Sequence, residues 1–176
     1  MSFLTRIFMS IRPRIPSAML PVPVADAPRK VEAIAFHTEG KMSTFGGPAD
    51  EGVSSTEGLA LWSANEIYHA PAGLFFKQQP QGTTGLARRL NPDAYYIACR
   101  WNYQELARRG ITRAKLRQCR CVVRSIAEPK KFALCYPADW GPHPDTGRVA
   151  DLSPGAAREL GLRTDDRVTV TLVTPE

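Results

Sequence analysis

Asp139 is the residue whose surroundings best suit acid–base chemistry. It follows the mainly apolar stretch that ends in Tyr136-Pro137-Ala138, and Trp140 and Gly141-Pro142 come directly after it. A carboxyl group beside an aromatic wall is desolvated, which favours its neutral form and suits a general acid. An aspartate in such a turn can instead accept hydrogen bonds from backbone N–H groups. Both roles are open for Asp139.

A second group of polar residues begins eight positions later. The stretch Gly147-Arg-Val-Ala-Asp151-Leu-Ser-Pro154 leads into a segment with the signals of a short helix. Ser153 is at the N-cap position, Pro154 is the first helical residue, and Gly161 ends the helix. We expect Asp151, just ahead of Ser153, to cap this helix and to complement its dipole.

These two stretches, in this order, resemble the end of the double-psi β-barrel of rare lipoprotein A and the expansins. That family has an Asp-x-Gly-Pro turn, then Gly-Arg-x-x-Asp-Leu-Ser, a short helix and a closing strand. The match runs from about Lys131 to Thr174. Upstream, Ser43-Thr-Phe-Gly-Gly-Pro48 and Ser55-Thr-Glu-Gly-Leu-Ala-Leu61 are similar to the family's first strand and following loop. The resemblance implies a mainly β fold, a six-stranded double-psi barrel.

The resemblance also implies an activity on peptidoglycan. In the resembled murein-cleaving enzymes, the carboxylate at the position of Asp139 protonates the glycosidic oxygen and then acts as base for internal ring closure. Hydrolysis by the usual route needs a second carboxylate, for which Asp50, Glu51 and Glu57 are the candidates. The family's histidine has no close counterpart in this chain, and His69 is nearest to it in order.

Aromatic and histidine side chains supply candidates for substrate binding. An aromatic face suits the axial C–H groups of a sugar, although a core position is the default for at least two of the three tryptophans. The candidates are Trp62, Trp140, His69 and His143. His143 lies between two prolines and is expected in an exposed loop, where it could assist proton transfer. Histidines and cysteines are not at zinc-ligand spacing, so neither a metal nor a cofactor is expected.

The chain divides at about residue 30. Residues 1–30 contain five prolines among apolar residues, which predicts an extended arm that lies along its own barrel or along a neighbouring subunit. A disordered leader is the alternative. We expect residues 31–176 to form the barrel, with a long loop insertion at 63–91 and one short helix at 153–160.

Alternation and the content of β-branched and aromatic residues predict the strands. We expect strands at 31–36, 41–45, 59–62, 94–101, 118–126, 131–136 and 167–174, with a further one at 74–76. A turn is expected at 37–40. A short helix is expected at 103–109, where Gly110 stops it, and Pro137 is expected to interrupt the strand before it.

The formal net charge of +6 and the pI near 9.4 suit an anionic partner, such as nucleic acid, a membrane surface or a cell-wall polymer. The basic residues cluster only at Arg88-Arg89, Arg108-Arg109 and 113–124. No aromatic residues alternate with them along the chain, as they do on a base-stacking platform. We therefore expect a solvated basic face and regard nucleic acid as the least favoured partner.

Cysteine usage and the N-terminus bear on the compartment. Cys99, Cys119, Cys121 and Cys135 form no CxxC pair, and we expect buried free thiols, with a disulfide from Cys99 to Cys119 or Cys121 left open. Arginines and prolines at 12–16 break the N-terminal apolar run too early for a secretion signal. No stretch approaches the ~18 apolar residues needed to span a membrane.

Three hypotheses for function follow. The first is an enzyme that binds or cleaves peptidoglycan glycan strands in the manner of a lytic transglycosylase. Such a protein would be made in the cytoplasm and carried to the wall by a phage particle or another secreted device. The second is a non-catalytic structural or adaptor component of a virion or tail, in which residues 1–30 tether neighbouring subunits. The third is a nucleic-acid-associated role, motivated by the positive charge alone.

Overall fold

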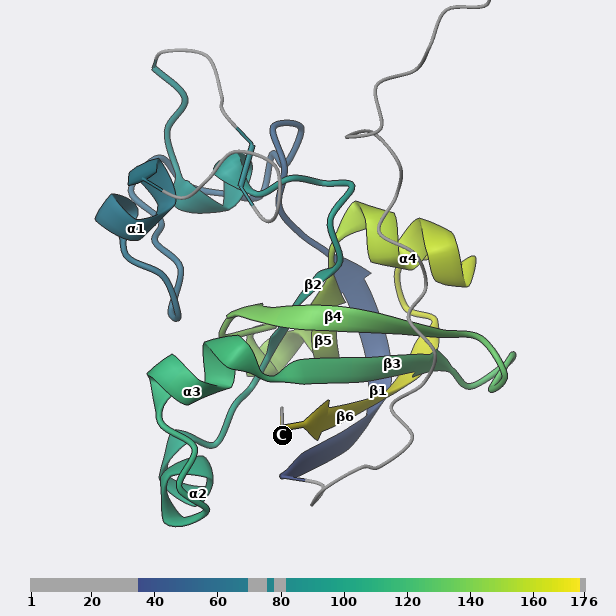
Figure 1. Cartoon of the computed structure of the whole chain (residues 1–176). Helices are drawn as coiled ribbons and strands as arrows, with labels where there is room; N and C mark the ends of the chain where they lie inside the picture. Colours follow the sequence, from purple (N-terminus) through teal and green to yellow (C-terminus); the bar gives the residue numbers. More distant parts are fainter. Residues whose placement is uncertain (1–34, 70–75, 78–81, 175–176) are drawn as a thin grey trace, which may run out of the picture.

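The computed structural model describes residues 35–69, 76–77 and 82–174, and in these ranges six strands form a closed barrel (Figure 1). The strands are β1 (Phe36–Thr44), β2 (Tyr96–Cys99), β3 (Arg120–Ser125), β4 (Phe132–Asp139), β5 (Arg148–Leu152) and β6 (Arg167–Val173). The fold is therefore mainly β, as the sequence predicts. The predicted arm at 1–30 lies outside the described residues.

The order of strands around the barrel is β1-β5-β2-β4-β3-β6, and β6 pairs with β1 to close it. The β1–β5 and β2–β4 pairs are parallel. The other neighbouring pairs are antiparallel, so the barrel is mixed. Strand β2 lies between β5 and β4, and it therefore separates the strand of Asp151 from the strand of Asp139.

Alternating residues fill the barrel. Strands β3 and β6 bury every second side chain, as expected for strands with one face toward a core. All four cysteines are free and buried, which agrees with the prediction of free thiols. Cys121 and Cys135 are direct partners across β3 and β4. Burial raises the pKa of both thiols, because a thiolate would lose its hydration inside the core.

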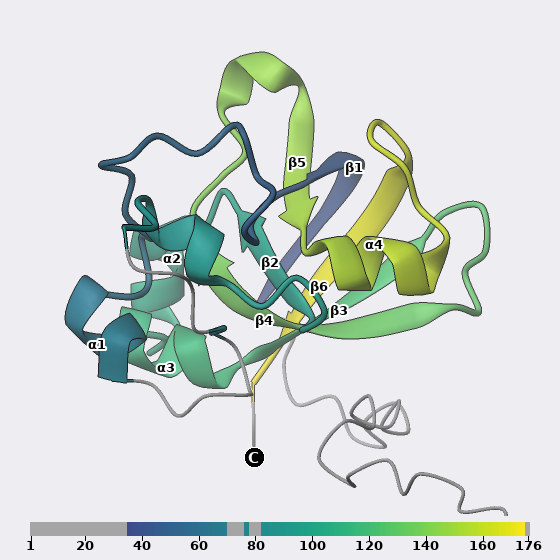
Figure 2. The same ribbon diagram turned by 90° about the horizontal axis from the view of Figure 1, so that it is seen from above.

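The structure has short helices at the two predicted places, 103–109 and 153–160, and two more that were not predicted, α1 (Ala64–His69) and α3 (Arg113–Gln118). The two predicted helices are α2 (Tyr103–Arg108) and α4 (Pro154–Leu160), and the 3-10 turns are η2 (Leu86–Arg89) and η3 (Pro144–Thr146). Helix α4 has the predicted ends, since Ser153 caps it and Gly161 follows it in the left-handed region. Helices α1, α2 and α3 lie on one side of the barrel and α4 on another (Figures 1 and 2).

Strand β1 corrects the prediction of two strands joined by a turn at 37–40. It runs without a break through Gly40 and pairs with β6 before and with β5 after this region. A Cβ atom on Gly40 would lie 2.6 Å from Cγ1 of Val149. Gly40 therefore allows the close approach of Val149 rather than a turn. Of the strand expected at 31–36, the first four residues lie outside the described ranges.

Other predicted strands differ in extent. Residues 59–62 form no strand, and only Phe76 of the predicted 74–76 strand is described, in an isolated bridge to Leu90. The predicted strand at 118–126 begins at Arg120, because helix α3 occupies 113–118. Strand β4 continues through Pro137 to Asp139. The register with β2 shifts just after Pro137, and such an irregularity tolerates a residue without an N–H.

A second hydrophobic cluster lies outside the barrel and is formed by the 45–62 loop, the insertion at 63–91 and the outer side of β2 and β4. Its buried members are Val53, Leu59, Ile67, Phe76, Ala87, Leu90, Tyr96 and Ala138. The Tyr96 hydroxyl also donates to the carbonyl of Phe45 at 3.2 Å. This cluster holds the loop against the end of β4, where Asp139 lies.

Candidate functional site

A row of outward-facing residues crosses four neighbouring strands at the candidate site. Ser43 on β1 is the partner of Asp151 on β5, Asp151 is the partner of Ala98 on β2, and Ala98 is the partner of Asp139 on β4. Residues directly opposite on adjacent strands share one face of the sheet. On β1, β5 and β2, the neighbours of these residues in the inner core are Met42, Ala150, Leu152, Ile97 and Cys99. This acidic row therefore places two carboxyl groups on either side of an alanine.

Asp139 lies in surroundings that suit both of the roles expected for it. Its Oδ1 accepts hydrogen bonds from the backbone N–H groups of Ala60, at 2.6 Å, and Trp140, at 2.7 Å. Burial raises its pKa to about 6, and the charges of Glu57 and Asp151 act in the same direction, while the two N–H donors oppose them. Because Oδ1 already accepts two hydrogen bonds, Oδ2 is the oxygen that would carry the proton of the neutral form, and it has no hydrogen-bond partner among the described residues.

Asp151 corrects the prediction of a helix cap. It lies on strand β5 rather than at the start of α4, and it accepts a hydrogen bond from the Ser43 hydroxyl. The cap of α4 is Ser153, whose Oγ accepts from the N–H of Ala156 at 3.1 Å, as predicted. Burial raises the pKa of Asp151, although Ser43 and Arg148 favour its charged form. Asp151 is therefore a member of the site that sequence reasoning missed.

Small residues separate the two carboxyl groups. Ala98 is the residue between them on β2, and the turn after Asp139 brings Gly141 close above it. A Cβ atom on Gly141 would lie 3.4 Å from Oδ2 of Asp151 and 3.8 Å from Cβ of Ala98. A larger side chain at either position would fill the space between the carboxyl groups. This close approach gives a physical reason for the glycine of the Asp-x-Gly-Pro turn.

The predicted second carboxylates shape the loop above the acidic row. The Asp50 carboxylate accepts from the N–H groups of Gly46, at 2.5 Å, and Gly52, at 2.9 Å. Glu57 accepts from the N–H of Ser54 at 3.0 Å. Both residues also act through their charge: that of Glu57 raises the pKa of Asp139, and that of Asp50 raises the pKa of Asp151. The structure thus brings them near the row but engages both in turns of the loop.

The predicted aromatic and histidine candidates differ in their exposure and in how close they lie to Asp139. Trp140 is 40% exposed and stands beside Asp139. Trp62 is partly buried, with its ring 5.5 Å from that of Phe76. His143 is exposed, and its Nδ1 accepts from the N–H of Asp145 in the η3 turn. His69 ends α1, and its side chain lies outside the described part. Trp140 is therefore the candidate that best combines exposure with closeness to the acid.

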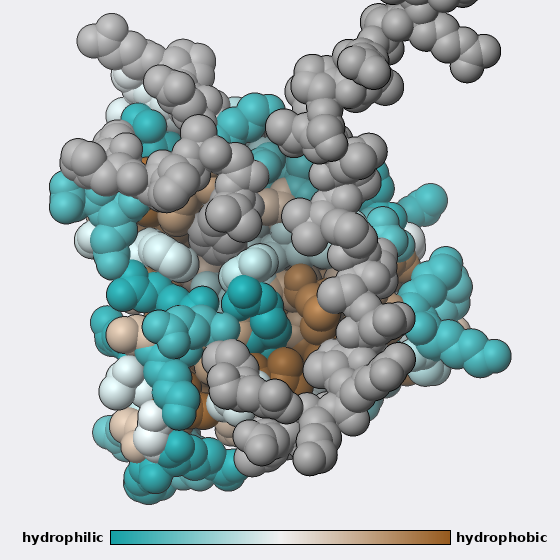
Figure 3. Space-filling view, viewed as in Figure 1, coloured by the Kyte–Doolittle hydropathy of each residue, from teal (hydrophilic) through white to brown (hydrophobic). Residues whose placement is uncertain are grey.

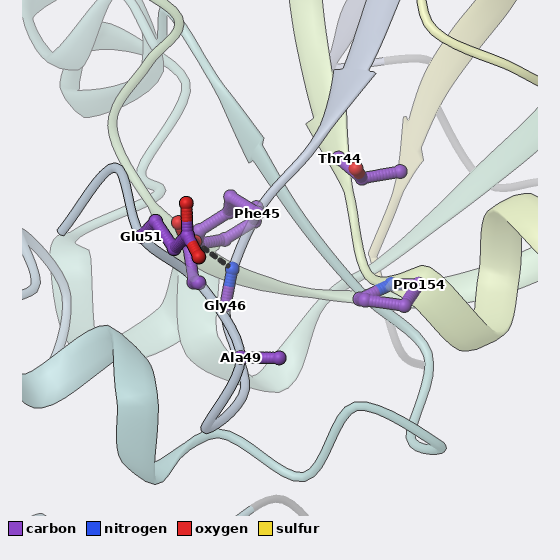
Figure 4. A pocket seen from close by; sticks show the side chains of 7 residues that line it. Thr44, Phe45, Gly46, Ala49, Glu51 and Pro154 are labelled. Atoms are coloured by element: carbon purple, nitrogen blue, oxygen red, sulfur yellow. Dashed lines mark hydrogen bonds between the residues drawn. The ribbon is translucent and has the colours of Figure 1, made fainter.

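A hollow of about 300 Å³ lies beside one end of the acidic row (Figure 4). It is lined by Thr44, Phe45, Gly46, Ala49, Asp50, Glu51 and Pro154. Thr44 follows Ser43, and Pro154 follows the cap residue Ser153, so the hollow is next to the Ser43–Asp151 end. Asp139 does not line it. A ligand in the hollow would therefore contact Asp50 and its loop, but not Asp139.

Tyr103 is a second residue that sequence reasoning missed. It starts α2, and its hydroxyl is buried without a hydrogen-bond partner among the described residues. Burial raises the pKa of Tyr103; the charge of Asp139 acts in the same direction, and that of Arg113 opposes it. Both charged groups are therefore close to its hydroxyl. In the sequence, Tyr103 was marked only as the start of a predicted helix, and this does not indicate a functional residue.

No protein-family model and no curated protein matches the chain. Within residues 35–69, 76–77 and 82–174, no group of three or more histidine, cysteine, aspartate or glutamate side chains could hold a metal ion. Among the same residues, none of the helices combines the length and the apolar character that crossing a membrane requires. The functional conclusion must therefore come from the arrangement of the acidic row.

Proposed function

We propose that this barrel binds and cleaves the glycan strands of peptidoglycan in the manner of a lytic transglycosylase. The observation that carries the proposal is the state of Asp139. Its pKa is raised to about 6, one of its oxygens is held by two N–H groups, and the other is left for a proton. A carboxyl group with such a pKa can both give and take a proton near neutral pH.

The arrangement of strands supports the finer assignment to a double-psi barrel. Six strands close with two parallel pairs, and the second of these pairs includes the strand that ends in Asp139. The Asp-x-Gly-Pro turn, strand β5 and capped helix α4 follow in the order that the resemblance requires. We take the closed mixed barrel and this order together as the basis for a relation to the rare lipoprotein A and expansin family.

The proposed reaction uses one acid and consumes no water. The proton on Oδ2 of Asp139 passes to the glycosidic oxygen as its bond to C1 breaks, and the leaving sugar departs as an alcohol. The resulting carboxylate then takes the proton of the C6 hydroxyl on the sugar that carries C1, and the oxygen of this hydroxyl forms a new bond to C1. The ring closes as a 1,6-anhydro product, and Asp139 is again protonated. The exposed ring of Trp140 is placed to stack on a sugar next to the cleaved bond.

Hydrolysis is the alternative reaction at the same site. Asp151 is the other desolvated carboxyl group, two strands from Asp139 across Ala98. Strand backbones in a sheet are about 4.8 Å apart, so residues two strands apart are separated by about 10 Å. Inverting glycosidases hold their two carboxyl groups about 6.5–9.5 Å apart with a water molecule between them, so this reaction requires the two side chains to lean toward each other from these backbones. The chemical end of the product distinguishes the two reactions, since hydrolysis leaves a reducing end.

The test is digestion of purified sacculi by the wild type, by Asp139→Asn and by Asp145→Asn. Asp145 is a matched control because its side chain is 89% exposed and lies in the η3 turn. We expect Asp139→Asn to release at least ~100-fold less soluble glycan, and Asp145→Asn to match the wild type. The released fragments should carry anhydro ends. Intact sacculi after treatment with folded wild type would contradict the proposal.

A non-catalytic module of a virion or tail is the second candidate. Two observations favour it: the hollow does not include Asp139, and both Asp50 and Glu57 are engaged in the loop. In that case sacculi stay intact, and deletion of residues 1–30 should prevent assembly with neighbouring subunits. Under either candidate, we propose that a particle or device carries the protein out of the cytoplasm in which it is made.

A further inference from the structure

Four arginines of α3 and β3 each lie on an aromatic ring from another part of the fold. The distances from guanidinium carbon to ring centre are 3.5 Å for Arg120 on Tyr136, 4.6 Å for Arg113 on Tyr103, 4.9 Å for Arg117 on Trp62 and 5.0 Å for Arg124 on Phe132. We call these four residues the arginine row. The rings come from other elements, α2, β4 and the 45–62 loop, so the sequence expectation that no aromatic residues accompany the basic cluster holds along the chain but not in space.

The positive charge of the protein is concentrated around this row. Residues 100–131 contain ten arginine and lysine residues against two glutamates, a balance of +8 compared with +6 for the whole chain. Within the described residues, only Arg117 of the row has an acidic partner, Glu66. Figure 3 shows hydrophilic side chains gathered over α2 and α3. Three of the four arginines, Arg113, Arg120 and Arg124, therefore have no acidic partner within the described part of the chain.

Backbone carbonyls help to orient two of these guanidinium groups. Arg120 donates to the carbonyls of Gln118, at 3.0 Å, and Cys119, at 2.8 Å. Arg124 donates to the carbonyl of Pro129 at 3.2 Å. A guanidinium held on a ring keeps its planar fork of N–H donors in a defined direction. Such a fork matches a carboxylate, which it can bind with two parallel hydrogen bonds.

The row begins beside the acidic row. Tyr103, under Arg113, lies within electrostatic reach of Asp139, and Tyr136, under Arg120, precedes Asp139 by three positions on β4. Trp62, under Arg117, follows Ala60, whose N–H holds Asp139. Three of the four rings thus belong to segments that contain or contact the proposed acid. A polymer that passed Asp139 could continue along the arginines.

We infer that the arginine row binds the carboxylates of the peptides attached to the glycan strand, so that the preferred substrate is peptide-bearing rather than bare glycan. The inference rests on the proposed function, because it takes the polymer at Asp139 to be peptidoglycan. One face of each ring is already covered by a guanidinium, so the rings are not free on that side to stack with nucleic-acid bases. This geometry favours carboxylate recognition over base stacking.

The test is a binding measurement with Asp139→Asn as the parent, which removes cleavage from the readout. Arg113→Gln/Arg120→Gln is compared with Arg158→Gln/Arg167→Gln, which removes the same charge from exposed ion pairs with Asp93 and Glu39. The probes are intact sacculi, glycan strands stripped of their peptides by an amidase, and a single-stranded DNA oligonucleotide, all at about 0.15 M salt.

We expect the row variant to bind intact sacculi about tenfold more weakly than the parent, and the control variant to stay within about twofold of it. Stripped glycan should bind the parent and both variants alike. An equal loss in the two double variants, or row-dependent binding to stripped glycan, overturns the inference. Row-dependent binding to the oligonucleotide that exceeds binding to sacculi also overturns it and assigns the row to nucleic acid.

These outcomes are separate from those of the cleavage test. If wild type leaves sacculi intact but binding depends on the row and on the peptides, the proposed reaction fails and the binding inference stands. If wild type releases anhydro products while the row variant binds as well as its parent, the reaction stands and the row has no part in recognition. All four substituted side chains are partly or wholly exposed, so we expect each variant to keep the fold. Thermal unfolding of each variant checks this.

Discussion

The acidic row and the arginine row meet near the end of β4, but the fold treats their charges in opposite ways. Asp139 and Asp151 lie on barrel strands, where burial raises the pKa of each carboxyl group. The arginines lie on aromatic rings, which stabilise their positive charge at the surface of the protein without deep burial. Burial in the barrel therefore changes the protonation of a carboxyl group, whereas contact with a ring orients a guanidinium group and leaves its charge unchanged.

The largest expected loss of stability comes from removing the side chain of Trp101, which packs beneath the acidic row. Trp101 is buried, packs on Phe36 and donates from Nε1 to the carbonyl of Asp139 at 2.7 Å. We expect Trp101→Ala to lower the free energy of unfolding by about 3–5 kcal/mol. Trp140→Ala is the control, and its exposed ring should change stability by about 0.5 kcal/mol or less. Urea unfolding measures both, and equal losses would contradict the distinction between the two rings.

The protonation of Asp139 should make stability depend on pH. Its pKa is about 6 in the folded state and near 3.8 when it is unperturbed, so its favourable contribution is complete below about pH 4 and is lost as the pH rises through 6. We expect the stability of Asp139→Asn relative to the wild type to increase by about 2 kcal/mol between pH 4 and pH 7. Urea unfolding at several pH values tests this. A stability difference that does not change with pH would show that Asp139 is not desolvated.

Removal of the helix caps near the two rows should lower the stability by smaller and unequal amounts. Ser153 is buried, caps α4 and also accepts from the N–H of Tyr96 at 3.4 Å. Thr112 caps α3, which carries Arg113, and is exposed. We expect Ser153→Ala to cost about 1–2 kcal/mol and Thr112→Ala about 0.5–1 kcal/mol. The melting temperatures of the two variants give the comparison, and a greater loss for Thr112→Ala would go against it.

The smallest effect is expected within the arginine row. Arg120→Gln removes a guanidinium that lies on Tyr136 at the sheet surface, and ring contacts of this kind contribute about 0.5–1 kcal/mol. We therefore expect a stability loss of no more than about 1 kcal/mol, with a clear loss of binding to sacculi. A stability loss comparable to that of Trp101→Ala would mean that the row serves the fold rather than a ligand.

Two elements of the barrel were predictable from local signals, whereas the barrel itself was expected from the resemblance and strand β5 was not predicted. Alternation predicted β6, and the Ser153, Pro154 and Gly161 signals defined α4. The failures also have local causes. Gly40 looked like a turn residue, but it serves the close approach of Val149, which belongs to a strand more than one hundred residues later. A glycine that is required by packing cannot be distinguished from a turn glycine without knowledge of the neighbouring strand.

The candidate site was predictable in part. Asp139 was identified because its aromatic and turn neighbours are adjacent in sequence, and the structure bears out both of its expected environments. Asp151 was assigned to a cap because Ser153 follows it, although its partner, Ser43, is 108 positions away. The rings under Arg120 and Arg124 were missed for the same reason, because they lie on the neighbouring strand β4. Strand register brings these residues together, and register does not follow from composition.

The proposed acid depends most on a raised pKa of the carboxyl group at position 139, which brings its titration close to neutral pH. The direct measurement is an NMR titration of aspartate side-chain carboxyl carbons in ¹³C-labelled protein, with the Asp139 signal assigned by its absence in Asp139→Asn. The account predicts a midpoint of about 6. A midpoint near the ordinary value of 3.8 would show that Asp139 is a solvated turn residue, and the proposed acid would be lost.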